Sequence, residues 1–295
     1  MLIFHAGCES EIAQSVPRGT VDNALVSYYR IDPMLAGRGD YEPLAVLKER
    51  MGWRNLMLDC GAFSADRMGK KVDLERYARY ITDHKDAIDI YISLDEKRDP
   101  EATRRNYERL RDHWGLRPMP VFQLGSEESN LRRMMETADG FFAIGNVVGH
   151  PFPKRDIEKR LDAVFYFNRE YQHKIHFFGS SARWVHMRYP FYSCDSTQWL
   201  LQAAYGTYQD FDPETGALIR GKMRKAPASL KMVESGMSIV EAEQSGYAAT
   251  SRGTLRRIGT ARSLHDYARW LTEMWHARGV WFDDLLHQRA YPELF

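Results

Sequence analysis

Short apolar runs, rich in β-branched and aromatic residues, alternate along the chain with longer charged segments. Several of these runs are continuously apolar, which is typical of strands that are buried on both faces of a parallel sheet. We therefore predict eight strands, at residues 2–5, 25–30, 55–59, 90–94, 119–123, 141–144, 174–178 and 191–195.

The charged segments between these runs have the periodicity of amphipathic helices. In residues 73–85, apolar side chains recur at spacings of three and four and share one helical face. Residues 100–114 begin with Pro after a capping Asp99, and residues 156–171 carry a third apolar stripe. The first crossover, residues 7–24, is only weakly helical.

Eight strands that alternate with helices predict an α/β fold, a (β/α)8 TIM-like barrel. A doubly wound sheet is the main competitor, but no GxGxxG motif follows the first strand. After Tyr205 the pattern changes, and residues 263–288 are typical of one or two amphipathic helices. We therefore expect a catalytic barrel at residues 1–205 and a basic, mostly helical C-terminal extension at residues 206–295, packed on the barrel.

Composition narrows the class of protein. The 295 residues can bury a full core, and the formal net charge of +1 means that any nucleic-acid affinity must come from a local basic patch. Cys8, Cys60 and Cys194 are far apart and form no CxxC pair, which argues against a zinc site and favours the cytoplasm. Neither a signal peptide nor an apolar run near the ~20 residues of a membrane span is expected.

Four of the predicted strands end in polar residues. The third ends in Asp59, the fourth runs into Asp95, the fifth ends in Gln123 and the eighth in Asp195. Since the carboxyl ends of barrel strands meet at one mouth, these side chains should converge there. Any one aspartate could equally shape a turn or cap a helix. The repeated pattern favours a functional site, because aspartate is a poor strand former.

Paired carboxylates suit the cleavage of a bond between a sugar and a nucleobase. One carboxylate can trap the oxocarbenium-like sugar covalently while the second group moves a proton to and from the leaving base. A third carboxylate and an amide can bind the edge of guanine, which donates from N1 and its exocyclic amine and accepts at O6. The residue types alone do not identify the substrate.

Six segments between residues 55 and 205 resemble the motifs of one enzyme superfamily, in the same order. They are LDCGAFS, SLDE, VFQLGS, FFAIGNVVGH, HFFGSSA and YSCDSTQW. They resemble the DSGGFQ-type turn, DE-containing strand end, VQGG, GGLAVGE, MGVG and FDCVxPTR segments of the tRNA-guanine transglycosylase superfamily. Within it, the chain is most similar to the 7-deazaguanine DNA transglycosylases of phages and bacteria.

The resemblance implies a role for each matching residue. Asp195 would be the nucleophile that forms a covalent glycosyl-enzyme intermediate, and Asp59 would be the general acid–base. The base would be bound by Asp95 and Gln123, helped by Gly145, Asn146 and Phe63. The implied reaction replaces guanine in the polymer by a free 7-deazaguanine such as 7-cyano-7-deazaguanine, without a cofactor.

The chain departs from the tRNA-modifying enzymes in ways that favour DNA as the partner. Their CxCxxC zinc motif is absent, so we expect no metal, and Ser196, Thr197 and Gln198 replace their PTR. A tRNA-guanine transglycosylase stays an alternative, as does a nucleoside hydrolase or DNA glycosylase that uses the same aspartates with water. Retention of both catalytic aspartates argues against a non-catalytic subunit, and a need for accessory proteins is left open.

Residues 221–262 are the most basic part of the chain, with eight basic and three acidic residues. Such a segment can neutralise phosphates, although a solvated surface is the other interpretation. We expect DNA contacts from Lys222, Arg224, Lys225, Arg252, Arg256 and Arg257. The histidines lack metal-binding spacing and are interpreted as structural or surface residues, namely His150, His173, His176 and His186.

Overall fold

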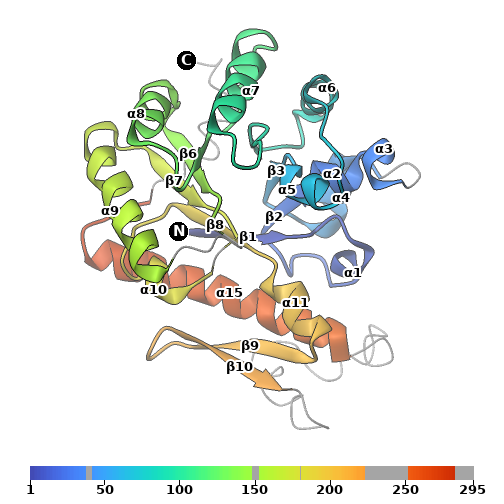
Figure 1. Ribbon diagram of the computed structural model, residues 1–295. Helices are drawn as coiled ribbons and strands as arrows, with labels where there is room; N and C mark the ends of the chain where they lie inside the picture. Colours follow the sequence, from blue (N-terminus) through green and yellow to red (C-terminus); the bar gives the residue numbers. More distant parts are fainter. Residues whose placement is uncertain (38–41, 148–152, 180, 223–251, 283–295) are drawn as a thin grey trace.

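Eight parallel strands form one curled sheet (Figure 1). The computed structural model describes residues 1–37, 42–147, 153–179, 181–222 and 252–282. The strands are β1 (Leu2–Ala6), β2 (Asn23–Ser27), β3 (Asn55–Asp59), β4 (Ile90–Tyr91), β5 (Val121–Gln123), β6 (Phe141–Gly145), β7 (Lys174–Phe177) and β8 (Ser193–Ser196). Their order is β4-β3-β2-β1-β8-β7-β6-β5, and Ile92 pairs in parallel with Met119 where β4 meets β5. The predicted (β/α)8 TIM-like barrel is confirmed.

Helices follow the strands and cover the outer face of the sheet (Figure 1). They are α1 (Glu11–Gln14), α2 (Tyr28–Ile31), α3 (Pro33–Ala36), α4 (Leu44–Met51), α5 (Ala62–Arg67), α6 (Leu74–His84), α7 (Pro100–Asp112), α8 (Glu128–Thr137), α9 (Lys154–Tyr171), α10 (Arg183–His186) and α11 (Gln198–Ala204). Asp73 and Asp99 cap α6 and α7 by accepting from backbone N–H groups three residues on, at 2.9 Å. No helix of the described ranges combines the length and apolar character needed to cross a bilayer.

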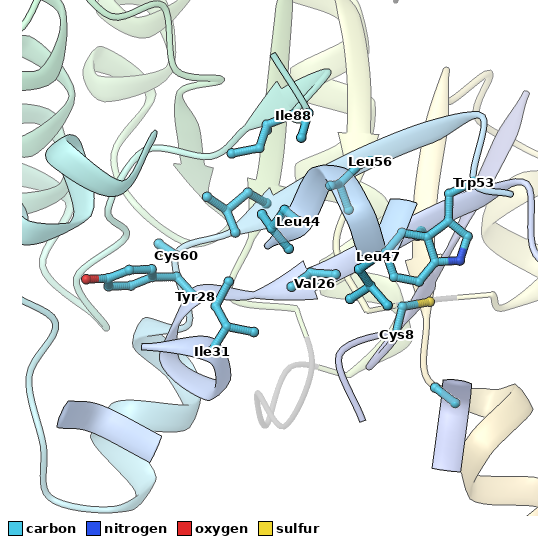
Figure 2. Packing of buried hydrophobic residues seen from close by; sticks show 14 of the residues in the cluster. Cys8, Val26, Tyr28, Ile31, Leu44, Leu47, Trp53, Leu56, Cys60 and Ile88 are labelled. Carbon is cyan, nitrogen blue, oxygen red and sulfur yellow. The ribbon is translucent and has the colours of Figure 1, made fainter. Parts of the chain in front are cut away.

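Side chains along each strand alternate between the barrel interior and the helical layer. On β3, Met57 belongs to the interior cluster, whereas Leu56 and Leu58 pack outward. Figure 2 shows this outward packing, in which Leu56 lies near Leu44 and Leu47 of α4. Asp59 follows Met57 by two residues, so the same alternation turns it toward the interior at the carboxyl end of the strand.

Helix α15 (Arg252–Ala277) runs antiparallel to β1 on the outside of the barrel. The N-terminal amine of Met1 donates to Thr272 Oγ1 at 2.6 Å, and the His5 ring lies 3.3 Å from the Ala261 carbonyl oxygen. A hairpin of β9 (Thr207–Asp212) and β10 (Ala217–Lys222) lies against the far side of α15 (Figure 1).

The C-terminal region differs in part from the predicted helices. Helix α15 is a single helix that begins 11 residues before the predicted start at 263. Residues 283–288 of the predicted helical segment lie outside the described residues. The hairpin of β9 and β10 is not predicted by the pattern. The boundary at residue 205 stays a prediction.

The second strand is shorter than the apolar pattern predicts. The pattern extends it to residue 30, but the chain turns into α2 after Ser27. The Tyr28 hydroxyl donates to Asp32 Oδ2 at 2.6 Å, and its ring packs against Tyr77. The first contact joins residues one helical turn apart, and the second joins α2 to α6. Together they outweigh the β propensity of the two tyrosines and Ile31.

Candidate active site

Polar residues from several strands gather at the carboxyl end of the barrel. Asp59 ends β3, Gln123 ends β5, Gly145 ends β6 and Asp195 lies in β8. The register pairs Gln123 with Gly145, so both lie at the same level of the barrel. Asp95 lies four residues beyond β4 and is hydrogen-bonded to Gln123. The residues that the strand ends single out are therefore brought to one mouth.

The carboxylate of Asp195 is contacted by two groups, the Gly179 N–H and the His176 ring. Its side chain is buried, with the residue only 8% exposed. The Gly179 N–H, just beyond β7, donates to Asp195 Oδ1 at 2.6 Å. The Nε2 of His176 lies 3.5 Å from the same oxygen. A backbone N–H at this distance fixes the orientation of a carboxylate and stabilises its charge.

Asp59 has a different environment. The Gly61 N–H donates to Asp59 Oδ2 at 3.0 Å. Burial raises the pKa of Asp59 from 3.8 to about 7, and the charge of Asp195 acts in the same direction, while the Gly61 hydrogen bond lowers it. Near neutral pH the Asp59 carboxyl group is therefore present in both protonation states. A group that both donates and accepts a proton during a reaction needs both states.

Gly61 is required by this geometry. Its φ is +76°, and a Cβ there would lie 2.4 Å from the Cβ of Tyr29 and 2.8 Å from Ser27 Oγ. The Gly residue lets the chain leave β3 in a tight turn that points its N–H back at Asp59.

Asp95 and Gln123 form one hydrogen-bonded unit across β4 and β5. The Gln123 amide donates to Asp95 Oδ1 at 2.6 Å and to the Glu96 carbonyl oxygen at 2.5 Å, and Thr103 donates to Asp95 Oδ1 at 3.1 Å. Burial raises the pKa of Asp95, while the bonds from Gln123 and Thr103 lower it. The Gln123 amide is thus engaged with protein groups, and no described residue donates to Asp95 Oδ2.

Of the three further predicted base contacts, Gly145 lies beside this unit, Asn146 contacts the residue after Gln123, and Phe63 lies on the helix after β3. A Cβ at Gly145 would lie 3.3 Å from Asp95 Oδ2 and 2.9 Å from Val121 Cγ1, so a larger residue would crowd the carboxylate. Asn146 has a left-handed backbone with φ +60°, and its amide lies 3.4 Å from the Leu124 carbonyl oxygen. Phe63 lies on α5 and is 53% exposed, with the Arg67 guanidinium 5.9 Å from its ring centroid.

Two residues of the mouth were not predicted as site residues. Glu9 follows β1, is 2% exposed, and lies 3.4 Å from both the Ser27 N–H and Arg30 Nε. Its charge contributes to the raised pKa of Asp59. Glu9 could have been found by the strand-end rule that singled out Asp59, because it also follows a predicted strand. His176 could not, because its contact with Asp195 depends on the pairing of β7 with β8.

The predicted DNA-contacting residues lie partly within the described chain. Lys222 ends β10 and Arg252 begins α15, whereas Arg224 and Lys225 lie outside the described residues. Arg257 donates to Thr254 Oγ1 at 2.8 Å and to Ser15 Oγ at 3.2 Å, and burial lowers its pKa.

The guanidinium of Arg256 packs against Gly206, 3.8 Å from where a Cβ would lie. Since α15 runs antiparallel to β1, the start of the helix, including Arg256, lies at the same end of the barrel as the aspartates.

The cysteines are buried and free of disulfides, and burial raises the pKa of each thiol. Among the described residues, no group of three His, Cys, Asp or Glu side chains is arranged to hold a metal ion.

No protein-family model and no curated protein matches the chain. Solved structures match it at low identity. The tryptophan synthase alpha chain of Legionella pneumophila subsp. pneumophila is 8% identical over 91% of both chains, with a TM-score of 0.47. The alpha subunit of the L. pneumophila strain Paris enzyme is 10% identical over 91% of this chain and 92% of that chain, with a TM-score of 0.43. An Aquifex aeolicus VF5 protein is 14% identical over 66% of this chain and 81% of its own, with a TM-score of 0.40.

Proposed function

We propose that this chain is a transglycosylase that exchanges guanine in DNA for a free 7-deazaguanine, through a covalent bond between the sugar and Asp195. One observation carries the proposal. Two aspartates, the half-buried Asp59 and the buried Asp195, interact electrostatically at the mouth of the barrel, and their environments differ. A pair of carboxyl groups with separate surroundings is what a double displacement at a sugar carbon requires.

The steps follow from the two environments. Asp195 attacks C1′ of the nucleotide as the bond from C1′ to the base breaks, and protonated Asp59 gives its proton to the leaving guanine. The incoming base then attacks C1′ from the side that guanine has left. Its proton passes to ionised Asp59, and Asp195 leaves as a carboxylate. Since the pKa of Asp59 is about 7, both of its protonation states are accessible at neutral pH.

The base edge would be bound by Asp95. Its Oδ1 is fixed by Gln123 and Thr103, which leaves Oδ2 to accept from the N1–H and the exocyclic amine of guanine. Gln123 therefore acts by orienting Asp95, instead of binding the edge of the base itself as the resemblance implies. Because Gly145 has no side chain, the space beside Asp95 Oδ2 stays open. A Cβ at position 145 would lie 3.3 Å from that oxygen.

The sequence favours DNA over tRNA, and the placement of the basic residues suits a polynucleotide of either kind. The chain lacks the CxCxxC motif of the tRNA-modifying enzymes. Arg256 and Arg257 lie at the mouth end of α15, where a polynucleotide would have to approach for a nucleotide to be turned out of the stack. Three free cysteines suit the reducing cytoplasm, which is that of the host if the protein is phage-encoded.

The test is an exchange assay with radiolabelled guanine and with a labelled 7-deazaguanine, run in parallel on duplex DNA and on bulk tRNA. We expect label to enter DNA, and Asp195→Asn to abolish its entry. Label in tRNA alone would keep the reaction but change the polymer. Release of guanine without any incorporation would identify a hydrolase, in which water replaces the incoming base, and would refute the exchange reaction.

A further inference from the structure

His176 lies in the barrel interior, directly beneath the proposed nucleophile. It is 0% exposed, and the rings of Phe4 and Phe178 lie edge-on to it at 6.1 and 4.8 Å. A polar side chain in such a place is costly unless its nitrogens are hydrogen-bonded. Core packing alone therefore does not explain a histidine at this position, and its two ring nitrogens are expected to have polar partners.

The two ring nitrogens have different neighbours. Nδ1 lies 2.8 Å from Ser193 Oγ. Nε2 has no hydrogen-bond partner among the described residues, and Asp195 Oδ1 lies 3.5 Å away from it. A bare Nε2 lone pair would repel the lone pairs of that carboxylate. The favourable arrangement therefore has the hydrogen on Nε2, with Nδ1 accepting from the Ser193 hydroxyl, which fixes the tautomer.

Both donors to Asp195 thus act on the same oxygen. The Gly179 N–H binds Oδ1 at 2.6 Å, and His176 Nε2 is aimed at Oδ1 as well. No described residue donates to Oδ2. The lone pairs of Oδ1 are directed at its donors, so Oδ2 is the more available of the two oxygens to form a bond with carbon.

We propose that His176 is a positioning residue that, with Gly179, holds Oδ1 and thereby makes Asp195 Oδ2 the attacking atom. The inference rests on the transglycosylase reaction proposed above. The Oδ2–C1′ bond forms as the C1′–N9 bond breaks, and the electron pair of that bond leaves with the base, which Asp59 protonates. Oδ1 becomes the carbonyl oxygen of the ester. In the return step Oδ2 leaves with the electron pair of its bond to C1′, and the two donors stabilise the carboxylate again.

The 3.5 Å separation is longer than an ordinary hydrogen bond. Contacts of this kind commonly shorten in the reacting complex. A contact that strengthens as the carboxylate charge returns acts on the rate of the chemical step more than on binding of the free base.

The first test needs no activity. Long-range ¹⁵N–¹H NMR of the folded protein reports which nitrogen of His176 carries a hydrogen. We expect a hydrogen on Nε2, and we expect Ser193→Ala to shift the tautomer toward Nδ1–H. A wild-type ring without a hydrogen on Nε2 would overturn the proposal.

The second test measures, in a single turnover, the rate at which the incoming base resolves the covalent enzyme–DNA species, the step in which the Asp195 carboxylate charge returns. His176→Phe suits the apolar surroundings of the ring but has no donor, and we expect it to lower this rate about 10- to 100-fold. The KM for the free base should stay within about twofold. His176→Gln, which can still donate toward Asp195, should recover part of the rate. His173→Gln, at the opposite end of β7, is the matched control and should react at the wild-type rate.

The outcomes separate the inference from the proposed function. A wild-type enzyme that forms no covalent species and exchanges no base refutes the transglycosylase reaction, and the tautomer measurement still decides the geometry. An active wild type with an equally fast His176→Phe variant refutes the role of His176 alone. If His176→Phe does not fold, Ser193→Ala decides in the same assay, with a slower rate expected and an unchanged rate against the proposal.

Discussion

The ends of β3 and β8 each place an aspartate at the same mouth of the barrel, and the surroundings of the two carboxyl groups differ. The end of β8 places Asp195 between a backbone N–H and an imidazole supplied by β7 and the residues after it. The end of β3 gives Asp59 one N–H, from its own turn, and burial together with the charge of Asp195 raises its pKa to about 7. One residue type at equivalent positions thus has two chemistries, because neighbouring strands provide the donors and charges.

The largest expected effect is at the end of β8. Asp195→Asn removes the proposed nucleophile with little change of shape, and we expect base exchange to fall by at least about 10⁴-fold, as for other essential nucleophiles. No covalent enzyme–DNA species should be trapped on a denaturing gel. Asp112→Asn, an exposed aspartate paired with Arg111, is the control and should exchange normally. A trapped species with Asp195→Asn would place the nucleophile elsewhere.

At the end of β3 the expected loss is smaller and depends on pH. Asp59→Asn removes the proposed general acid–base, and we expect the rate to fall by about 10²- to 10⁴-fold. The wild-type rate should change slope near pH 7, where Asp59 titrates, and the variant should lack that inflection. A variant profile with the same inflection would show that another group carries the proton.

The turn after β3 can be tested through stability. Gly61→Ala meets both a positive φ and a Cβ contact of 2.4 Å with Tyr29, and we expect it to lower the free energy of unfolding by about 3 kcal/mol. Gly69→Ala has a similar φ of +64° but open space around the new Cβ, so it should cost only about 1 kcal/mol. Equal losses in urea unfolding would mean that the close approach to Tyr29 is relieved by a shift of the backbone.

The raised pKa of Asp59 also predicts how stability varies with pH. The native state binds more protons than the unfolded state between the ordinary value of 3.8 and about 7. This contribution to the free energy of unfolding is fully present below that window and is lost as the pH rises through it, on the order of 4 kcal/mol. Urea unfolding at pH 4 and pH 8 should show a smaller difference for Asp59→Asn than for the wild type. An unchanged difference would show that Asp59 ionises normally in the folded protein.

The smallest effect is expected from Glu9. Its charge is a minor contributor to the raised pKa of Asp59. Glu9→Gln should therefore move the inflection of the rate profile to lower pH by less than about one unit. A shift to higher pH would show that loss of the partner leaves Arg30 or the loop in a new position, and that Glu9 acts by structure and not by charge.

The barrel could be predicted from the sequence because its strands are apolar on both faces, and Asp59, Asp95, Gln123 and Asp195 could be located because each follows such a run. The turn into α2 could not, since it depends on Tyr28 reaching Asp32 and Tyr77. The orienting role of Gln123 and the contact of His176 with Asp195 depend on which strands pair. Such pairings join residues distant in sequence, and local patterns carry no information on them.

The seam between β4 and β5 has a thermodynamic consequence. Within the described strands, backbone pairing there is a single bridge, Ile92 with Met119, and the hydrogen bond from Gln123 to Asp95 joins the same two strands. A ligand that binds Asp95 therefore acts on the element that closes the barrel. A base that binds the native protein at this point would stabilise it against unfolding. Above Kd, the melting temperature would rise with the logarithm of the base concentration.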